Sequence, residues 1–279
     1  MYSLDSFENG FSYLSVSNEV AHAKIALQGA HIFEYQAKDK EPLLWLSEES
    51  SFEAGSAIRG GIPLCWPRFG NRDKSLPQHG FARTALFELI SVEEINSQLT
   101  QVHLRLKSSV KSREIWDYEF VLDVVFDISE KLKISMTTHN VGSTEFLLTQ
   151  AFHTYFQVSD IEDVVIKGLE EISFIDTLRE EHCIEHEPIV IKSEVDRVYE
   201  GDIGLIELWD KAKKVEIFAE NSASAIVWNP WSKKCLQMSG MRDDAYREFV
   251  CIESANAFDD FKILKAGEEK SIKVTLRSF

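Results

Sequence analysis

The stretch from Arg59 to Arg83 gathers positive charge and rigid loop residues in one place. It reads RGGIPLCWPRFGNRDKSLPQHGFAR, and its charged side chains are Arg59, Arg68, Arg72, Lys74 and Arg83 against Asp73 alone, a formal charge of +4. A guanidinium group offers a planar fork that matches a phosphate with two hydrogen bonds. We interpret the stretch as a preorganised anion pocket; the alternative is a solvated, mildly basic loop.

Three further segments carry side chains that could transfer protons or bind hydroxyl groups. His153 lies among aromatic residues in TQAFHTYF, and a histidine titrates near neutral pH, although one in an apolar run is often a core residue. Glu253 interrupts the apolar run FVCIESA; on a strand it shares a face with Cys251, and a carboxylate buried there needs a partner or a role. A structural ion pair is the alternative for Glu253. Asp196, followed by Arg197 in VDRVY, reads by itself as a surface ion pair.

Several chemistries lack their motifs in this chain. There is no G-x-G-x-x-G, no G-x-x-x-x-G-K-[ST] and no G-x-S-x-G, which argues against dinucleotide, P-loop and serine-hydrolase sites. His182, Cys183 and His186 could suggest a metal site, but no helical or strand periodicity brings them together, so we interpret the segment as a solvated loop. We expect no metal and no cofactor.

The elements that must position these residues are short strands. Apolar and polar residues alternate with period two between turn signals, which predicts antiparallel strands. The clearest runs are Lys24–Leu27, Val102–Leu106, Phe120–Phe126, Leu132–Met136, Val164–Ile166, Val215–Phe218, Phe249–Ile252 and Ile272–Leu276. Gly204–Lys211 is the best helical candidate. We therefore predict an all-β fold, a large antiparallel β-sandwich with few short helices.

Composition bounds the class of protein and its partners. The chain has 279 residues, 44% of them hydrophobic, and a formal net charge of −16. It is too apolar for a disordered chain, has no apolar run long enough for a membrane span, and is too acidic for a nucleic-acid partner. Four cysteines without a C-x-x-C pair and a start without a targeting segment favour a cytoplasmic protein. No linker divides residues 1–279, so we expect one domain, and the acidic surface favours a monomer.

Together the segments resemble a known family. RGGIPLCWPRFG, then HGFAR, FHTYF, VDRVY and a late CIESA occur in the order found in the glucose-6-phosphate 1-epimerase (hexose-6-phosphate mutarotase) family, and the resemblance spans about residues 10 to 276. That family belongs to the aldose 1-epimerase, or galactose mutarotase-like, superfamily. The resemblance implies the large β-sandwich of that superfamily and the interconversion of α and β anomers of aldohexose 6-phosphates, glucose 6-phosphate first among them.

The resemblance also implies a role for individual positions. His153 matches the catalytic histidine and Glu253 the catalytic glutamate. His79 matches a second histidine that contacts the sugar, and Asp196 a carboxylate that hydrogen-bonds sugar hydroxyls. Arg59 and Arg83 match basic residues that favour the 6-phosphate. Arg68, and Trp228 in VWNPW, are weaker candidates for substrate contact.

Three other functions remain open from the sequence. A non-catalytic protein on the same fold would bind a sugar phosphate without needing both His153 and Glu253. A glycoside hydrolase or lyase would pair Glu253 with Asp196 and leave the basic loop unused. A mutarotase for unphosphorylated hexoses would not need the cations of the Arg59–Arg83 stretch.

Overall fold

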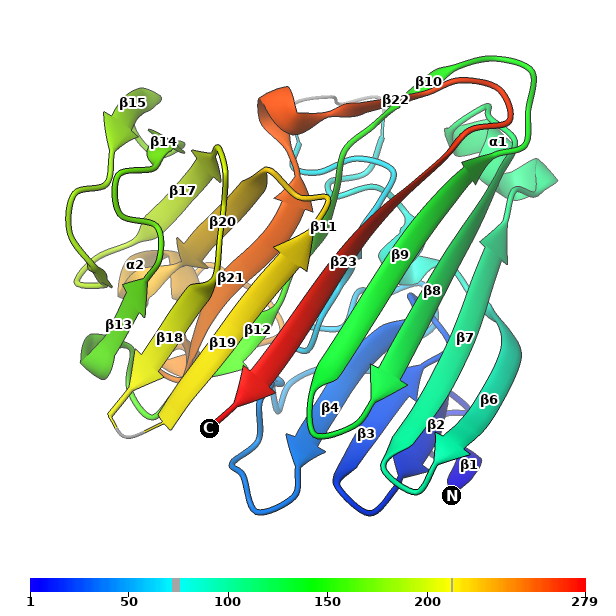
Figure 1. The fold of residues 1–279 in the computed structure, drawn as a ribbon, viewed down its shortest axis with the longest axis horizontal. Coiled ribbons are helices and arrows are strands. Elements are labelled where there is room, and N and C mark those ends of the chain that lie inside the picture. The colour runs from blue at the N-terminus through cyan, green and yellow to red at the C-terminus, as the bar shows by residue number, and fades with distance from the viewer. Residues whose placement is uncertain (72–75, 212) are drawn as a thin grey trace.

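A nine-stranded antiparallel sheet forms one layer of the molecule and faces the viewer in Figure 1. The computed structural model describes residues 1–71, 76–211 and 213–279, so Arg72, Asp73 and Lys74 of the basic stretch lie outside the described residues. In spatial order the strands are β16 (Ile189–Val190), β13 (Val164–Lys167), β18 (Ile206–Asp210), β19 (Lys213–Glu220), β23 (Glu269–Ser278), β9 (Leu132–Asn140), β8 (Phe120–Ile128), β7 (Leu99–Lys107) and β6 (Glu88–Asn96).

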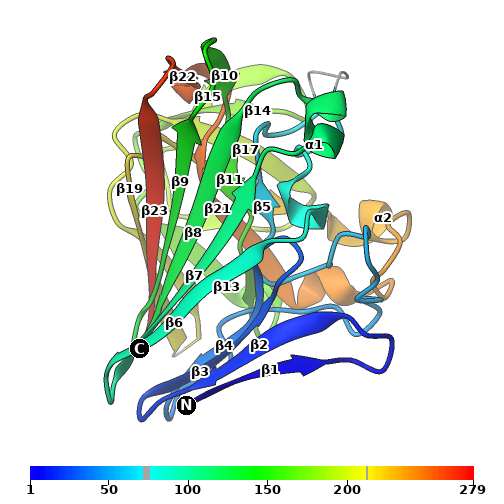
Figure 2. The same ribbon diagram turned by 90° about the vertical axis from the view of Figure 1, so that its right-hand side faces the viewer.

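An eight-stranded antiparallel sheet forms the second layer. Its strands are β15 (Glu181–Ile184), β14 (Ser173–Asp176), β17 (Val195–Glu200), β20 (Ser224–Asn229), β21 (Phe249–Asn256), β11 (Gln150–Phe152) and β5 (Leu64–Cys65), with β12 (Tyr155–Gln157) also paired to β21. Figure 2 shows β23, β9 and β8 on one side and β17, β21 and β5 on the other.

Alternating side chains of the two sheets meet in a common hydrophobic core. The strands β7, β8 and β9 contribute every second residue to it, for example Leu104, Val124 and Ile134, and each of these is fully buried. From the other sheet come residues such as Tyr199 and Ile252. The strands expected from period-two alternation are therefore confirmed, because the buried residue of each pair is the apolar one.

A third sheet, formed by the N-terminal segment, closes one end of the sandwich. It is antiparallel and consists of β1 (Tyr2–Ser6), β2 (Ser12–Ser17), β3 (Ala21–Ala26) and β4 (His31–Ala37). Asn18 donates a hydrogen bond to the carbonyl of Ile128 (2.9 Å), and the Tyr35 hydroxyl donates one to the carbonyl of Ser129 (2.7 Å). These bonds tie the N-terminal sheet to the turn between β8 and β9. The strands β10 (Phe146–Leu148) and β22 (Lys262–Leu264) pair separately.

Helical structure in the described residues is limited to short segments. The α-helices are α1 (Val110–Ile115) and α2 (Trp231–Cys235), and single turns of 3-10 helix span Ala82–Thr84, Ile161–Asp163, Ala245–Arg247 and Phe258–Asp260. Within the described chain, no helix is long and apolar enough to cross a membrane. The expected all-β antiparallel sandwich with few short helices is confirmed.

Two local expectations are wrong. The helical candidate Gly204–Lys211 contains strand β18, in which Ile206 and Leu208 alternate with more exposed residues against β13 and β19. The segment of His182 and Cys183, interpreted as a loop, is the edge strand β15. Both strands were missed because the pattern in each is short, and an edge strand has one neighbour to bury its side chains against.

Candidate active site

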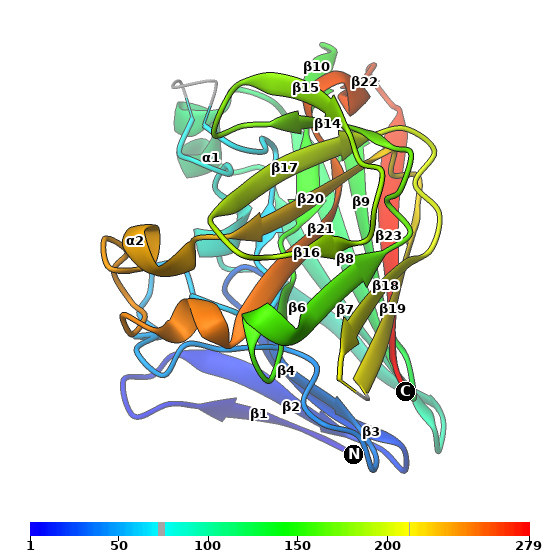
Figure 3. The ribbon, with the colours of Figure 1, turned by 90° about the vertical axis from the view of Figure 1, so that its left-hand side faces the viewer.

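The predicted site residues gather on the face of the eight-stranded sheet that points away from the common core. The pairing register aligns Asp196 of β17 with Trp228 of β20, Trp228 with Cys251 of β21, and Cys251 with Tyr155 of β12. Paired residues of antiparallel strands point to the same side of a sheet. The intervening residues, such as Val227 and Ile252, enter the common core instead. Figure 3 shows α2 on this outer side of the sheet, away from β23 and β9.

His153 and Glu253 form a buried pair on this face. Phe152 pairs with Ser254 and Tyr155 with Cys251, so the same register continues through the short break between β11 and β12 and brings His153 opposite Glu253. The Nε2 atom of His153 lies 3.4 Å from Oε1 of Glu253, and the two side chains are 11% and 2% exposed. Among the described residues the second carboxylate oxygen of Glu253 has no hydrogen-bond partner.

The surroundings of this pair favour its uncharged form. Burial raises the pKa of Glu253 well above its ordinary value, and the nearby Asp196 raises it further. Burial lowers the pKa of His153 well below its ordinary value, and His79 and Arg83 act in the same direction. A neutral carboxylic acid beside a neutral imidazole holds one proton between them. The pair can therefore give a proton at one atom and take one at the other.

Two aromatic side chains fix the His153 ring. Tyr155 stacks on it with 4.9 Å between ring centroids and 8° between planes, and Trp228 meets it edge-on at 5.9 Å. Stacked and edge-on contacts restrict rotation of the imidazole. Tyr155 is not among the predicted site residues. The available signal is its position two residues after His153, because residues i and i+2 of a strand share a face.

His79 reaches the pair from a tight loop. Its ring centroid lies 5.6 Å from that of His153. The loop is held against Trp66, whose backbone N–H donates to the carbonyl of His79 (3.1 Å) and whose carbonyl accepts from Phe81 (3.0 Å). Gly80 has φ +71°, and a Cβ atom at this position would lie 2.1 Å from the Trp66 carbonyl oxygen. The glycine in HGFAR is therefore required for His79 to lie where it does.

Arg59 and Arg83 supply positive charge beside the pair. Both are half-buried. Burial is the largest cause of the lowered pKa values of His153 and His79, and both arginines lower these pKa values further. One guanidinium nitrogen of Arg83 donates to the carbonyl of Gln78 (2.7 Å). The backbone N–H of Ser47 donates to the carbonyl of Arg59 (3.0 Å). The next residue, Gly60, packs closely against the backbone of Trp45 and Leu46. Arg68 is half-buried on the loop that carries His79.

Asp196 lies in the same row but does not pair with its neighbour. Burial raises the pKa of Asp196 against the opposing effects of Thr177 and Lys234. Arg197 points to the other face and forms an ion pair with Glu185 at 2.7 Å. The interpretation of Asp196 and Arg197 as a surface ion pair is therefore wrong, since consecutive strand residues point to opposite sides.

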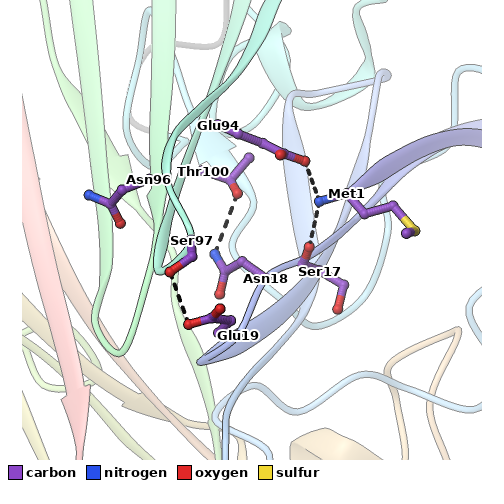
Figure 4. A pocket seen from close by; sticks show the side chains of 8 residues that line it. All are labelled: Met1, Ser17, Asn18, Glu19, Glu94, Asn96, Ser97 and Thr100. Atoms are coloured by element: carbon purple, nitrogen blue, oxygen red, sulfur yellow. Dashed lines mark hydrogen bonds and ion pairs between the residues drawn. The ribbon is translucent and has the colours of Figure 1, made fainter.

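Other parts of the described chain offer less chemistry. No group of three or more potential metal ligands occurs among residues 1–71, 76–211 and 213–279. A hollow of about 370 Å³ lies between the N-terminus and the β6–β7 hairpin (Figure 4). Its polar groups already bond one another: Ser97 donates to Glu19 (2.9 Å), and the amino group of Met1 pairs with Glu94. None of the predicted site residues lines it.

Comparisons with known proteins find relatives that match nearly the whole chain. The sequence matches the profile of the aldose 1-epimerase family over residues 13–277. A relative from Escherichia coli (strain K12) is 33% identical over 94% of this chain and 90% of its own length, and one from Cenchrus ciliaris is 35% identical over 91% and 80%; both carry the name "Putative glucose-6-phosphate 1-epimerase". A crystal structure from Salmonella typhimurium, described as a "putative mutarotase", superimposes with a TM-score of 0.93 at 28% identity, covering 99% of this chain and 93% of that one.

Proposed function

The chain belongs to the aldose 1-epimerase family, and on that premise we propose that it interconverts the α and β anomers of aldohexose 6-phosphates, with glucose 6-phosphate as the preferred substrate. The observation that carries this proposal is the buried His153–Glu253 pair with two arginines beside it. A pair that holds one proton suits a reaction in which one sugar oxygen loses a proton and another gains one.

Ring opening uses the charged form of the pair. The Glu253 carboxylate accepts the proton of the C1 hydroxyl, and protonated His153 donates its proton to the ring oxygen. The bond between C1 and the ring oxygen breaks, its electrons stay on that oxygen, and C1 becomes an aldehyde. Glu253 is then protonated and His153 neutral, which is the form of the pair that burial favours. The site thus stabilises the open-chain intermediate.

Ring closure reverses these transfers on the other face of the aldehyde. C1 rotates about the C1–C2 bond, and neutral His153 accepts the proton of the former ring oxygen while Glu253 returns its proton to the carbonyl oxygen. Neither protons nor electrons are gained or lost over the cycle. Each proton transfer contributes on the order of 10²- to 10⁴-fold to the rate.

The phosphate has two effects in this proposal. Bound between Arg59 and Arg83, it holds the sugar through contacts far from C1. It also neutralises two of the positive charges that lower the pKa of His153. Phosphate binding therefore brings the charged form of the pair, in which His153 carries the proton, closer in free energy to the neutral form. Arg59 and Arg83 would thus make a phosphorylated sugar both bind more tightly and react faster than an unphosphorylated one.

Saturation-transfer NMR on glucose 6-phosphate tests the proposal. Irradiating the C1 proton of one anomer should reduce the signal of the other in the presence of the protein, at a rate that grows with protein concentration. Exchange no faster than in buffer would overturn it. Binding without faster exchange would identify a non-catalytic sugar-phosphate protein, and equal rates on glucose and glucose 6-phosphate would identify a mutarotase for unphosphorylated sugars.

A further inference from the structure

The second histidine of the site has an unusual set of neighbours around one ring nitrogen. The Nδ1 atom of His79 lies 3.2 Å from the sulfur of Cys65 and 3.3 Å from the backbone nitrogen of Gly70. Cys65 is on strand β5, fully buried, and paired with Ala151 of β11 in the same sheet as Glu253. The strand and the loop therefore converge on a single atom of the imidazole.

Both neighbours act as donors toward that atom. A backbone N–H can only donate, so the contact with Gly70 requires Nδ1 to accept. Burial raises the pKa of the Cys65 thiol well above its ordinary value, and Glu253 raises it further, so the sulfur keeps its hydrogen. A thiol S–H is a weak donor that also fits an unprotonated ring nitrogen. A proton on Nδ1 would point at two other hydrogens.

We propose that Cys65 is a positioning residue: its thiol, with the N–H of Gly70, holds His79 in the tautomer whose proton is on Nε2, so that His79 donates a neutral hydrogen bond to an oxygen of the substrate. The inference rests on the proposed function for the identity of that substrate. It assigns a purpose to the thiol in GGIPLCWP, a buried residue that acid–base transfer between His153 and Glu253 does not use.

The position of the ring supports a role as hydrogen-bond donor. The His79 ring lies 5.6 Å from the His153 ring between centroids, so a sugar held by the pair would lie beside the His79 ring. The side-chain amide nitrogen of Gln78 lies 3.4 Å from Nε2. With the proton on Nε2, the amide presents its oxygen there after a half-turn that leaves the heavy-atom positions unchanged.

The same surroundings keep His79 from competing as an acid. Burial, with Arg83 and Arg59 nearby, lowers the pKa of His79 to about 3. His79 therefore stays neutral near neutral pH. Its tautomer then decides whether Nε2 donates a hydrogen bond or accepts one. In the other tautomer, Nε2 would present a lone pair to an oxygen lone pair and repel it.

Nitrogen-15 NMR on protein labelled in the histidine rings tests the tautomer without any substrate. The His79 signals are assigned by their loss in a His79→Gln variant. We expect an unprotonated Nδ1 and a protonated Nε2 in the wild type and in Cys65→Ser, which keeps a donor. In Cys65→Ala we expect a mixture of tautomers, because Gly70 alone remains. A protonated Nδ1 in the wild type, or a tautomer that is unchanged in Cys65→Ala, would overturn the inference.

Kinetics on the same variants test the consequence. Cys65→Ala should lower kcat/KM for glucose 6-phosphate by about three- to tenfold, the effect of one hydrogen bond, and Cys65→Ser should stay within about twofold of wild type. If the cavity left by alanine unfolds the protein, Cys65→Val fills the space without a donor. Cys183→Ala, a cysteine of edge strand β15, serves as the control.

Equal losses in the serine and alanine variants would mean that the thiol only fills space, and would overturn the inference. Anomer exchange no faster than in buffer, combined with the expected tautomer in the wild type, would remove the proposed function and leave the role of Cys65 in fixing the His79 tautomer intact. The two failures are thus distinguishable, since one is read from ring nitrogens and the other from sugar protons.

Discussion

At the scale of single residues, the proton shared by His153 and Glu253 governs how the rate should vary with pH. A second proton would make the buried pair a cation, so the acid limb of kcat should lie below the ordinary histidine pKa of 6.5. Loss of the one proton would leave a buried carboxylate, so the alkaline limb should lie above the ordinary glutamate pKa of 4.5. We expect kcat to stay level as pH falls through 6.5.

This profile is measured as kcat, because the substrate phosphate itself titrates near pH 6 and would distort kcat/KM. Saturation-transfer rates at saturating glucose 6-phosphate from pH 5 to 9 give the profile. A kcat that halves near 6.5 on the acid side would show an ordinary, solvated histidine and contradict the role of burial at His153.

Replacing Glu253 by glutamine should separate activity from stability. The amide has the shape of the acid but cannot accept the C1 proton, so exchange should fall by on the order of 10²- to 10⁴-fold. Burial already disfavours the charged carboxylate, so the thermal midpoint should be unchanged or higher. Differential scanning calorimetry and saturation-transfer NMR measure the two quantities. A fully active variant would remove Glu253 from the mechanism.

Arg83→Met should distinguish phosphate binding from sugar binding. Methionine keeps much of the aliphatic stem and removes a charge-assisted hydrogen bond, so KM for glucose 6-phosphate should rise by about ten- to a hundredfold. The rate on glucose should not fall, since glucose makes no such bond and loss of the Arg83 charge raises the pKa of His153. Arg277→Met, on the nine-stranded sheet, is the control. An unchanged KM for glucose 6-phosphate would exclude Arg83 from the phosphate site.

The residues that could be foreseen are those that break a pattern. His153 and Glu253 interrupt apolar runs, and the arginines stand out against an acidic chain. Cys65 could not be foreseen, because a thiol in an apolar segment looks the same whether it faces the core or the site. The strand register decides between the two, and register depends on partners far away in the sequence.

At the scale of elements, the loop that carries His79 depends on a single close contact. Alanine at Gly80 would place Cβ 2.1 Å from the Trp66 carbonyl oxygen and would strain a φ of +71°. Gly10 has a similar φ of +81° with nothing within 4 Å of its Cβ position, so Gly10→Ala pays the backbone cost alone. Gly80→Ala should therefore destabilise the protein by at least about 1 kcal/mol more than Gly10→Ala.

Urea unfolding of both variants gives the two free energies, and the exchange rate on glucose 6-phosphate reports the position of His79. Gly80→Ala should lose activity and Gly10→Ala should keep it. Equal losses of stability in the two variants would show that the loop can move away from Trp66. The close contact between Gly80 and Trp66 would then not hold His79 in place.

The sequence predicts a strand correctly where one face of that strand is buried and the other is more exposed. Strands β7, β8 and β9 have neighbours on both edges and a buried face, so buried residues alternate along most of their length. β15 is an edge strand of four residues, and β18 is a five-residue strand whose sequence also fits a helical turn. Short patterns carry too few residues to separate the periods 2 and 3.6.

At the scale of the whole molecule, the net charge of −16 is compatible with an anionic substrate because charge is not uniform. Arg59 and Arg83 both lower the pKa values of His79 and His153, so positive charge is concentrated beside the pair. Screening at physiological salt has a length of about 8 Å, so distant surface carboxylates act weakly on this site. The acidic surface therefore does not prevent a phosphorylated sugar from binding at the basic site.

The common core predicts that the chain unfolds as one unit. Side chains from all three large sheets enter it, for example Leu14 from β2, Val124 from β8 and Ile252 from β21, and each is almost completely buried. Melting any one sheet would expose apolar surface on the others, which couples them. We therefore propose that residues 1–279 are a single domain and expect one calorimetric transition, with a van't Hoff enthalpy equal to the measured enthalpy. Two resolved transitions would contradict this, and loss of the N-terminal sheet first would show that its bonds to the β8–β9 turn do not couple it to the sandwich.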